Sequence, residues 1–368
     1  MDHPNLDEKT WPYFRVHCLK NSNNANEFVL VVSFLHAIED AISSLKFMED
    51  LLFALDHLSQ NLTLPEVDRK PIGPSMDELL TKYEPEFWLR TIWNKIRGFR
   101  PTSFWLKEHN NEQEPFSCPE VVPRGASQWI NRSTGMTLRS LPREFSEKLL
   151  AACRQNGVTV HGALSAAMII NAASILRSKY PELAQKFPTG LAVSHVQSLS
   201  VRQYIGISNN VIGMFVSGAG GSFQNVNEGS LFWEIAKQVK KNVQNCIDSK
   251  EFAVLWKMAA AGMDRDPTTE IPNCGRMSTT EISNVGVSPQ ACNFPNFRMQ
   301  ELYFSPGLRM QGGLFFCGAV TLQTTTDQPS QGGNMCLSFG HVEPIITESE
   351  GILFAERVIE TLQRVCTQ

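Results

Sequence analysis

Short continuous apolar runs along the chain alternate with stretches in which apolar residues return at helical spacing. Residues 27–35 (EFVLVVSFL) form a run rich in Val and Phe, which predicts a buried strand. The polar residues HAIED follow. The segment 41–58 then places its apolar residues on one helical face: Ile42, Leu45, Met48, Leu51, Leu52 and Leu55. The pattern predicts a strand, a polar turn and an amphipathic helix.

The rest of the chain predicts a mixture of strands and long helices. Prolines and a polar tract weaken the pattern from about 60 to 128, which indicates a linker with a short helix near 76–97. Helices are expected at 142–157, where Gly157 is the stop signal, and at 158–180, 228–247 and 348–365. Strands are expected near 136–141, 190–196, 211–217, 279–285, 300–305, 313–322 and 334–340. This mixture predicts an α/β or α+β protein with mixed sheets.

Composition and charge narrow the classes of partner and compartment. The net charge of −4 gives no basic face, so a nucleic-acid partner is not expected. Nine dispersed cysteines form no C-x-x-C pair, which argues against a zinc site and a disulfide framework and favours a reducing, cytoplasmic compartment. No signal peptide and no apolar run long enough to span a bilayer are visible.

His36 and Asp40 are the first candidates for chemistry, because they directly follow the strand expected at 27–35. A neutral imidazole at a strand end can take a proton from a hydroxyl near neutral pH. A carboxylate four residues later can stiffen the turn by pairing with an arginine. On spacing alone, a hydrogen-bonded structural histidine is the more common outcome, so both interpretations stay open.

Five segments, in order, resemble one superfamily. They are H-A-I-E-D at 36–40, TVHGALSAAMIINAASIL at 159–176, VIGMFVSG at 211–218, ISNVG at 282–286 and LSFGHVEPIITESEGILFAERVIETL at 337–362. Together they resemble the chloramphenicol-acetyltransferase-like superfamily, which includes peptide-synthetase condensation domains. The closest likeness is to fungal alcohol acetyltransferases of secondary metabolism.

The resemblance implies a two-lobed fold with mixed sheets and a CoA-dependent mechanism without a bound cofactor or metal. His36 would take the proton from a small-metabolite alcohol that attacks acyl-CoA, with acetyl-CoA as the default donor. Ser283 or Asn284 would donate to the tetrahedral oxyanion. Asp40 would be structural, and Arg202 is the expected partner of its carboxylate. A solvated surface arginine is the alternative.

Three departures from the family pattern keep other functions open. The signature H-H-x-x-x-D-G has Leu35 in place of its first histidine and Ala41 in place of its glycine, and a side chain at Ala41 could shift the turn. Only 35 residues precede His36, so we expect residues 1–128 to hold a reduced first lobe and linker, and 129–368 the second lobe. A partner chain could complete the first lobe. The alternatives are a catalytically inactive binding protein and a condensation-type enzyme that uses carrier-bound acyl groups.

Three other histidines, His161, His195 and His341, are expected to be structural. The glycine-rich stretch SGAGGS at 217–222 fits no nucleotide-binding motif and predicts a turn. Oligomeric state, acyl-chain length and the identity of the acceptor do not follow from the sequence.

Overall fold

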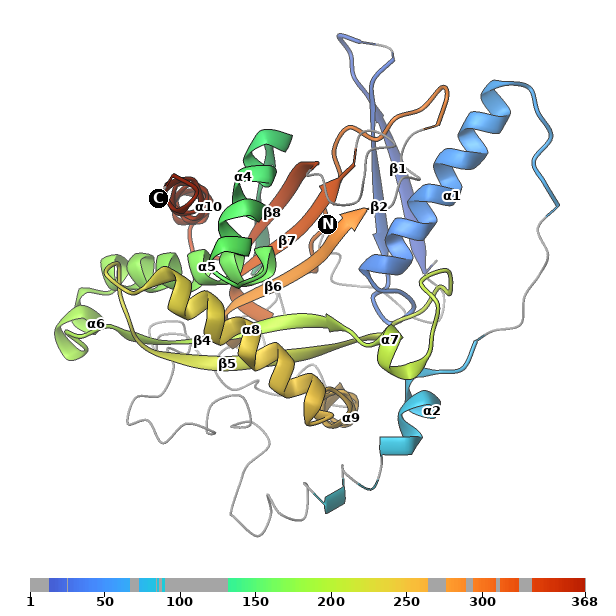
Figure 1. Cartoon of the computed structure of the whole chain (residues 1–368). Helices are drawn as coiled ribbons and strands as arrows, with labels where there is room; N and C mark the ends of the chain where they lie inside the picture. The colour runs from blue at the N-terminus through green and yellow to red at the C-terminus, as the bar shows by residue number, and fades with distance from the viewer. Residues whose placement is uncertain are drawn as a thin grey trace.

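The computed structural model describes residues 13–24, 26–66, 73–83, 85, 88–89, 132–263, 276–288, 294–308, 312–323 and 333–367. Within these residues the protein is a mixed α/β molecule built on a two-stranded hairpin and a six-stranded sheet (Figure 1). The expected linker therefore lies mostly outside the described residues, and the lobe boundary at 128/129 stays a prediction.

The hairpin and the first long helix form one unit. Strand β1 (Phe14–Lys20) pairs antiparallel with β2 (Phe28–Phe34), and helix α1 (Ala41–Ser59) packs against them. The rings of Phe14 and Phe34 lie 5.7 and 5.2 Å from the ring of Phe47, in edge-on contacts that join hairpin and helix. The apolar run at 27–35 is therefore a strand, as its pattern predicts. The expectation that this strand is buried is wrong, because its residues are exposed or partly buried in a two-stranded hairpin.

The large sheet has the order β3-β8-β7-β6-β4-β5. The β4–β6 and β6–β7 pairs are parallel and the other pairs are antiparallel, so the sheet is mixed, as expected. Its strands are β3 (Ser133–Leu141), β4 (Leu191–Ser200), β5 (Val216–Val226), β6 (Arg276–Ser288), β7 (Gly312–Leu322) and β8 (Asn334–Glu343).

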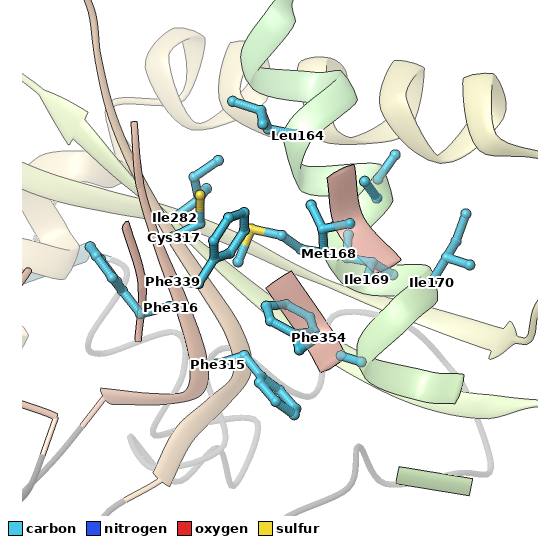
Figure 2. Packing of buried hydrophobic residues seen from close by; sticks show 14 of the residues in the cluster. Leu164, Met168, Ile169, Ile170, Ile282, Phe315, Phe316, Cys317, Phe339 and Phe354 are labelled. Atoms are coloured by element: carbon cyan, nitrogen blue, oxygen red, sulfur yellow. The ribbon is translucent and has the colours of Figure 1, made fainter. Parts of the chain in front are cut away.

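Helix α5 (Val160–Lys179) is the centre of the main core. It packs against α8 (Phe232–Asp248), α10 (Glu348–Val365) and α4 (Arg143–Gln155) and against strands β4 to β6. Figure 2 shows its side chains meeting those of the sheet and of α10. The labelled members of this cluster are Leu164, Met168, Ile169, Ile170, Ile282, Phe315, Phe316, Cys317, Phe339 and Phe354.

Helix α5 is long and apolar enough to cross a bilayer by length and composition, and it is the one such helix in the described part of the chain. However, 83% of its apolar window is buried inside the protein. Its buried residues occupy all sides, as in the central helix of a packed core.

A smaller core lies where α2 (Met76–Leu80), α7 (Arg202–Ile205) and α9 (Glu251–Met263) meet β5. A short 3-10 turn (Thr81–Tyr83) follows α2, and α6 (Pro181–Lys186) follows α5. Figure 1 shows α7 and its loop close to the start of α1. This arrangement brings the turn after β2 next to the second half of the chain.

The segment 294–308 links α1 to the sheet face opposite α5. The Asn296 amide N–H donates to Asp56 on α1 at 2.8 Å, and Leu302 and Tyr303 pack against buried residues of β7 and β8. The sequence predicts a strand at 300–305, which is wrong, because this stretch lies over the face of the sheet and pairs with no edge strand.

The turn predicted at 217–222 is also wrong. SGAGGS lies inside β5, paired with β4 from Ser217 to Ser222. An ideal Cβ on Gly221 would lie 2.3 Å from the Asn242 amide nitrogen of α8, so glycine there permits close packing of the helix on the strand.

Candidate active site

His36 lies in the exposed turn between β2 and α1. Its ring nitrogen Nδ1 lies 2.8 Å from the backbone oxygen of Glu39. A carbonyl oxygen only accepts hydrogen bonds, so in the neutral ring Nδ1 carries the hydrogen and Nε2 keeps a lone pair. The turn therefore presents the nitrogen that a general base needs.

Asp40 fixes the end of this turn to the start of α1. It is the helix N-cap, and its Oδ1 accepts the Ser43 backbone N–H at 2.8 Å. Ala41 is the first helical residue, and its φ is not positive. Alanine therefore causes no backbone strain at the position where the family signature has glycine.

Asp40 and Arg202 form a buried ion pair. Arg202 Nη2 lies 2.9 and 3.0 Å from the two carboxylate oxygens, and the side chains are 2% and 0% exposed. The Phe215 N–H donates to Asp40 Oδ2 at 3.0 Å. The pairing expected from the sequence is present, and the surface-arginine alternative is wrong.

Arg202 also holds the loop between α7 and β5. Its guanidinium donates to the backbone oxygens of Ser208 and Val211 at 3.0 and 2.8 Å and stacks on the Phe215 ring at 4.7 Å. Ser43 Oγ accepts the Gly213 N–H at 3.0 Å. The turn that carries His36 is thus fixed to the second half of the chain by a hydrogen-bond network whose central residues, Asp40, Ser43 and Arg202, are all buried.

Two further carboxylates, those of Glu39 and Glu281, interact electrostatically with His36, and the sequence patterns predict neither as a site residue. Burial raises the pKa of Glu39, whose carboxylate accepts from the Ser44 hydroxyl, and the charge of His36 acts in the opposite direction. Burial also raises the pKa of Glu281 on β6, against the effects of the Gly313 N–H, Arg276 and His36. A charged residue in the middle of the strand-like stretch TTEISNVG is the signal that could have identified Glu281.

Ser283 and Asn284 lie on β6 beyond Glu281, where they are partly buried. Asn284 Oδ1 accepts the Gly286 N–H at 2.8 Å across a bulge in the strand, which leaves the amide nitrogen as its donor. Ser283 shares the sheet face of Glu281, because alternate residues of a strand face the same side. Donation to an oxyanion by either residue stays a prediction.

The three histidines that are predicted to be structural each lie close to a neighbouring polar side chain. His161 Nε2 lies 2.8 Å from Gln197 Oε1, and His195 Nδ1 lies 2.8 Å from Thr280 Oγ1. Burial lowers the pKa of His195 to about 3, so its ring is neutral in the folded protein. His341 is buried on β8, 3.6 Å from Glu343.

Among the surface hollows of the described residues, two are lined by residues distant in sequence from the turn. One is lined by residues of α5 and α10 with Glu228, and the other by residues of β5 and α8. The interlobe channel that the family resemblance implies at His36 coincides with neither. The described residues also hold no group of three metal-ligating side chains.

Comparison with solved structures supports the fold. The chain is similar to an epimerization domain of tyrocidine synthetase B, at 15% identity and a TM-score of 0.57, covering 97% of this chain and 72% of that one. It is also similar to the cyclization-docking bidomain of EpoB from Sorangium cellulosum (15% identity, TM-score 0.60, 100% and 64% covered). A third neighbour is polyketide synthase associated protein 5 of Mycobacterium tuberculosis, at 10% identity and a TM-score of 0.56, covering 99% of this chain and 79% of that one.

No curated protein sequence matches the chain significantly. The family model for alcohol acetyltransferase, in contrast, matches residues 4–348, nearly the whole length. Such a match includes the turn that carries His36, the Arg202 helix and β6. The chain belongs to the alcohol acetyltransferase family, and this membership indicates an acyltransferase-type function.

Proposed function

We propose that the protein is an O-acyltransferase that moves an acyl group, with acetyl as the default, from acyl-CoA to the hydroxyl of a small metabolite. The observation that carries this proposal is the hydrogen bond from His36 Nδ1 to the Glu39 carbonyl. It directs the free lone pair of Nε2 outward, in a turn that Asp40 and Arg202 hold in place.

The reaction needs no covalent enzyme intermediate. His36 Nε2 takes the hydroxyl proton while the alcohol oxygen forms a bond to the thioester carbonyl carbon. Collapse of the tetrahedral intermediate breaks the C–S bond, and the imidazolium returns the proton to the departing CoA sulfur. Ser283 Oγ and the Asn284 amide nitrogen are the proposed donors to the oxyanion.

The test measures release of the CoA thiol from acetyl-CoA in the presence of a panel of alcohols. His36→Ala should lower the rate roughly 100- to 10,000-fold, the usual contribution of a positioned general base. His57→Ala is the matched control. His57 lies on the adjacent helix α1, is partly buried, and also has Nδ1 bonded to a backbone oxygen, that of Phe53 at 3.1 Å. It should leave the rate unchanged.

Three other outcomes would contradict the proposal. Equal rates for the wild type and His36→Ala would exclude His36 as the base. No transfer from any acyl-CoA by the folded wild type would favour a non-catalytic member of the family. Transfer that requires an acylated carrier protein would favour the condensation-type alternative.

A further inference from the structure

A hollow of about 340 Å³ is lined by residues of α5 and α10 and by Glu228, which precedes α8. Helix α5 packs on one face of the large sheet, whereas Leu45 of α1 packs on the other face, against Val320 and Cys336. The hollow is therefore separate from the turn that carries His36, and the proposed mechanism uses none of its residues.

Two polar side chains at the floor of this hollow are almost completely buried. Asn171 on α5 is 7% exposed, and Thr361 on α10 is 6% exposed. Asn171 Nδ2 donates to the Ala167 backbone oxygen at 2.8 Å and to Thr361 Oγ1 at 3.0 Å. Because a backbone oxygen can only accept, the orientation of the amide is fixed, and both of its N–H groups are used.

Asn171 and Thr361 each keep one hydrogen-bonding group without a partner. No described residue donates to Asn171 Oδ1, which is not sealed off by the protein, and no described residue accepts the hydroxyl hydrogen of Thr361. Oδ1 and Nδ2 share one carbon atom, so Oδ1 lies beside the Thr361 hydroxyl. Polar atoms of buried side chains nearly always have a partner in native proteins. An acceptor and a donor side by side at the floor of a hollow therefore point to a ligand group that enters there.

One wall of the hollow is held in place by Ser174, which is 5% exposed. Arg357 Nη1 donates to Ser174 Oγ at 2.7 Å, and the Ser174 hydroxyl donates to Glu228 Oε1 at 2.5 Å. These bonds fix both charged side chains before any ligand arrives. Such preorganisation lowers the entropic cost of binding.

The rim of the hollow carries one cationic and one anionic side chain, those of Arg364 and Glu360. Both are exposed, and they lie four residues apart on α10, a spacing at which opposite charges on a helix can pair. Neither forms an ion pair with the other or with any described residue. Both charges are therefore available to a ligand.

We propose that this hollow binds free amino acids whose side chain ends in a carboxamide, that is, glutamine or asparagine. A carboxamide presents an N–H donor and a C=O acceptor side by side, so it satisfies Asn171 Oδ1 and the Thr361 hydroxyl together. The carboxylate of the amino acid pairs with Arg364 and its ammonium with Glu360. This binding site is independent of the proposed acyl transfer.

The first test compares three probes on the wild-type protein by titration with saturation-transfer-difference NMR, which measures weak binding. L-Glutamine has all three groups, L-norleucine replaces the carboxamide by an apolar chain of similar length, and glutaramate lacks the ammonium. Norleucine should bind roughly 10-fold more weakly than glutamine, the worth of the hydrogen bonds at the floor. Glutaramate should bind up to about 5-fold more weakly, because the charge that it leaves unpaired is exposed.

The second test changes the floor and the rim separately. Thr361→Val removes the hydroxyl and should raise the Kd for glutamine roughly 10-fold, with no change for norleucine, whose binding also reports that the hollow is intact. Thr361→Ser keeps a hydroxyl and should bind glutamine as the wild type does. Arg364→Gln should raise both Kd values up to about 5-fold. Arg154→Gln, at an exposed arginine in the last turn of α4, is its matched control and should change neither.

Three results would overturn this inference. The first is that none of the three probes binds to the wild type, which would mean that the hollow holds only solvent. The second is that glutamine binds no more tightly than norleucine. The third is a Kd for glutamine that is the same in the wild type and in Thr361→Val.

Discussion

Removing the guanidinium of Arg202 tests how the turn bearing His36 is held. In Arg202→Met, the Asp40 carboxylate stays buried with only the donors from Ser43 and Phe215. Loss of one partner from a buried pair costs about 3–5 kcal/mol, because the remaining charge is uncompensated. Both side chains are almost fully buried, so the free energy of unfolding should fall by an amount in this range.

Urea unfolding followed by tryptophan fluorescence measures this loss. Arg139→Met is the matched control, because Arg139 pairs with Glu356 at the surface, where the side chains are 36% and 44% exposed. An exposed pair contributes about 0–1 kcal/mol, so this variant should stay close to the wild type. The double variant Asp40→Ala, Arg202→Met should lose less than the sum of its two single variants, since it leaves no lone charge.

Two results would refute the reasoning about this ion pair. The first is a loss for Arg202→Met no larger than that for Arg139→Met. The second is strict additivity of Asp40→Ala and Arg202→Met, which would mean that the two side chains contribute independently despite the 2.9 Å contact.

Three further predictions concern other parts of the molecule. His195 binds a proton in the unfolded chain near pH 6.5, but burial lowers its pKa in the folded protein to about 3. Acidification from pH 7 to 5 should therefore lower the free energy of unfolding by about 2 kcal/mol. The His195→Gln variant should lose correspondingly less over this range, as measured by urea titrations at each pH. Gly351→Ala places a Cβ 2.2 Å from the ring of His341 and should destabilise the protein by about 1–3 kcal/mol. Adding His341→Ala should relieve the clash. A Gly351→Ala variant as stable as the wild type would contradict this packing. Ala41→Gly, which restores the residue of the family signature, should destabilise α1 by about 0.5–1 kcal/mol and leave acetyl transfer no faster; a faster variant would show that the alanine displaces the base.

Local sequence patterns predict much of the fold. The apolar run at 27–35 is β2, and the helical spacing after it is α1. The apolar stretch at 158–180 is α5, and the last amphipathic pattern is α10, whose bounds at 348–365 match. In these segments the period of the apolar residues predicts the type of element, although β2 is exposed or partly buried and not buried as expected.

The elements that local patterns miss depend on neighbours far along the chain. β1 has exposed residues on both faces and forms because β2 offers a pairing edge. The glycines of β5 resemble a turn, yet the strand persists because β4 pairs with it and α8 packs closely on it. The 300–305 stretch has a strand-like composition but lies over the sheet instead of pairing at its edge.

The sequence by itself determined the family, the main helices and strands, and the proximity of His36 to Asp40, since residues four apart across a turn are neighbours in any fold. The tertiary structure decided which charges meet across the molecule. It placed Arg202 on Asp40, 162 residues away, and Glu281 within electrostatic reach of His36. Burial then set the pKa values and the energetic cost of those charged groups. The cost of removing a carboxylate from water depends on the surrounding packed chain and not on the residue alone.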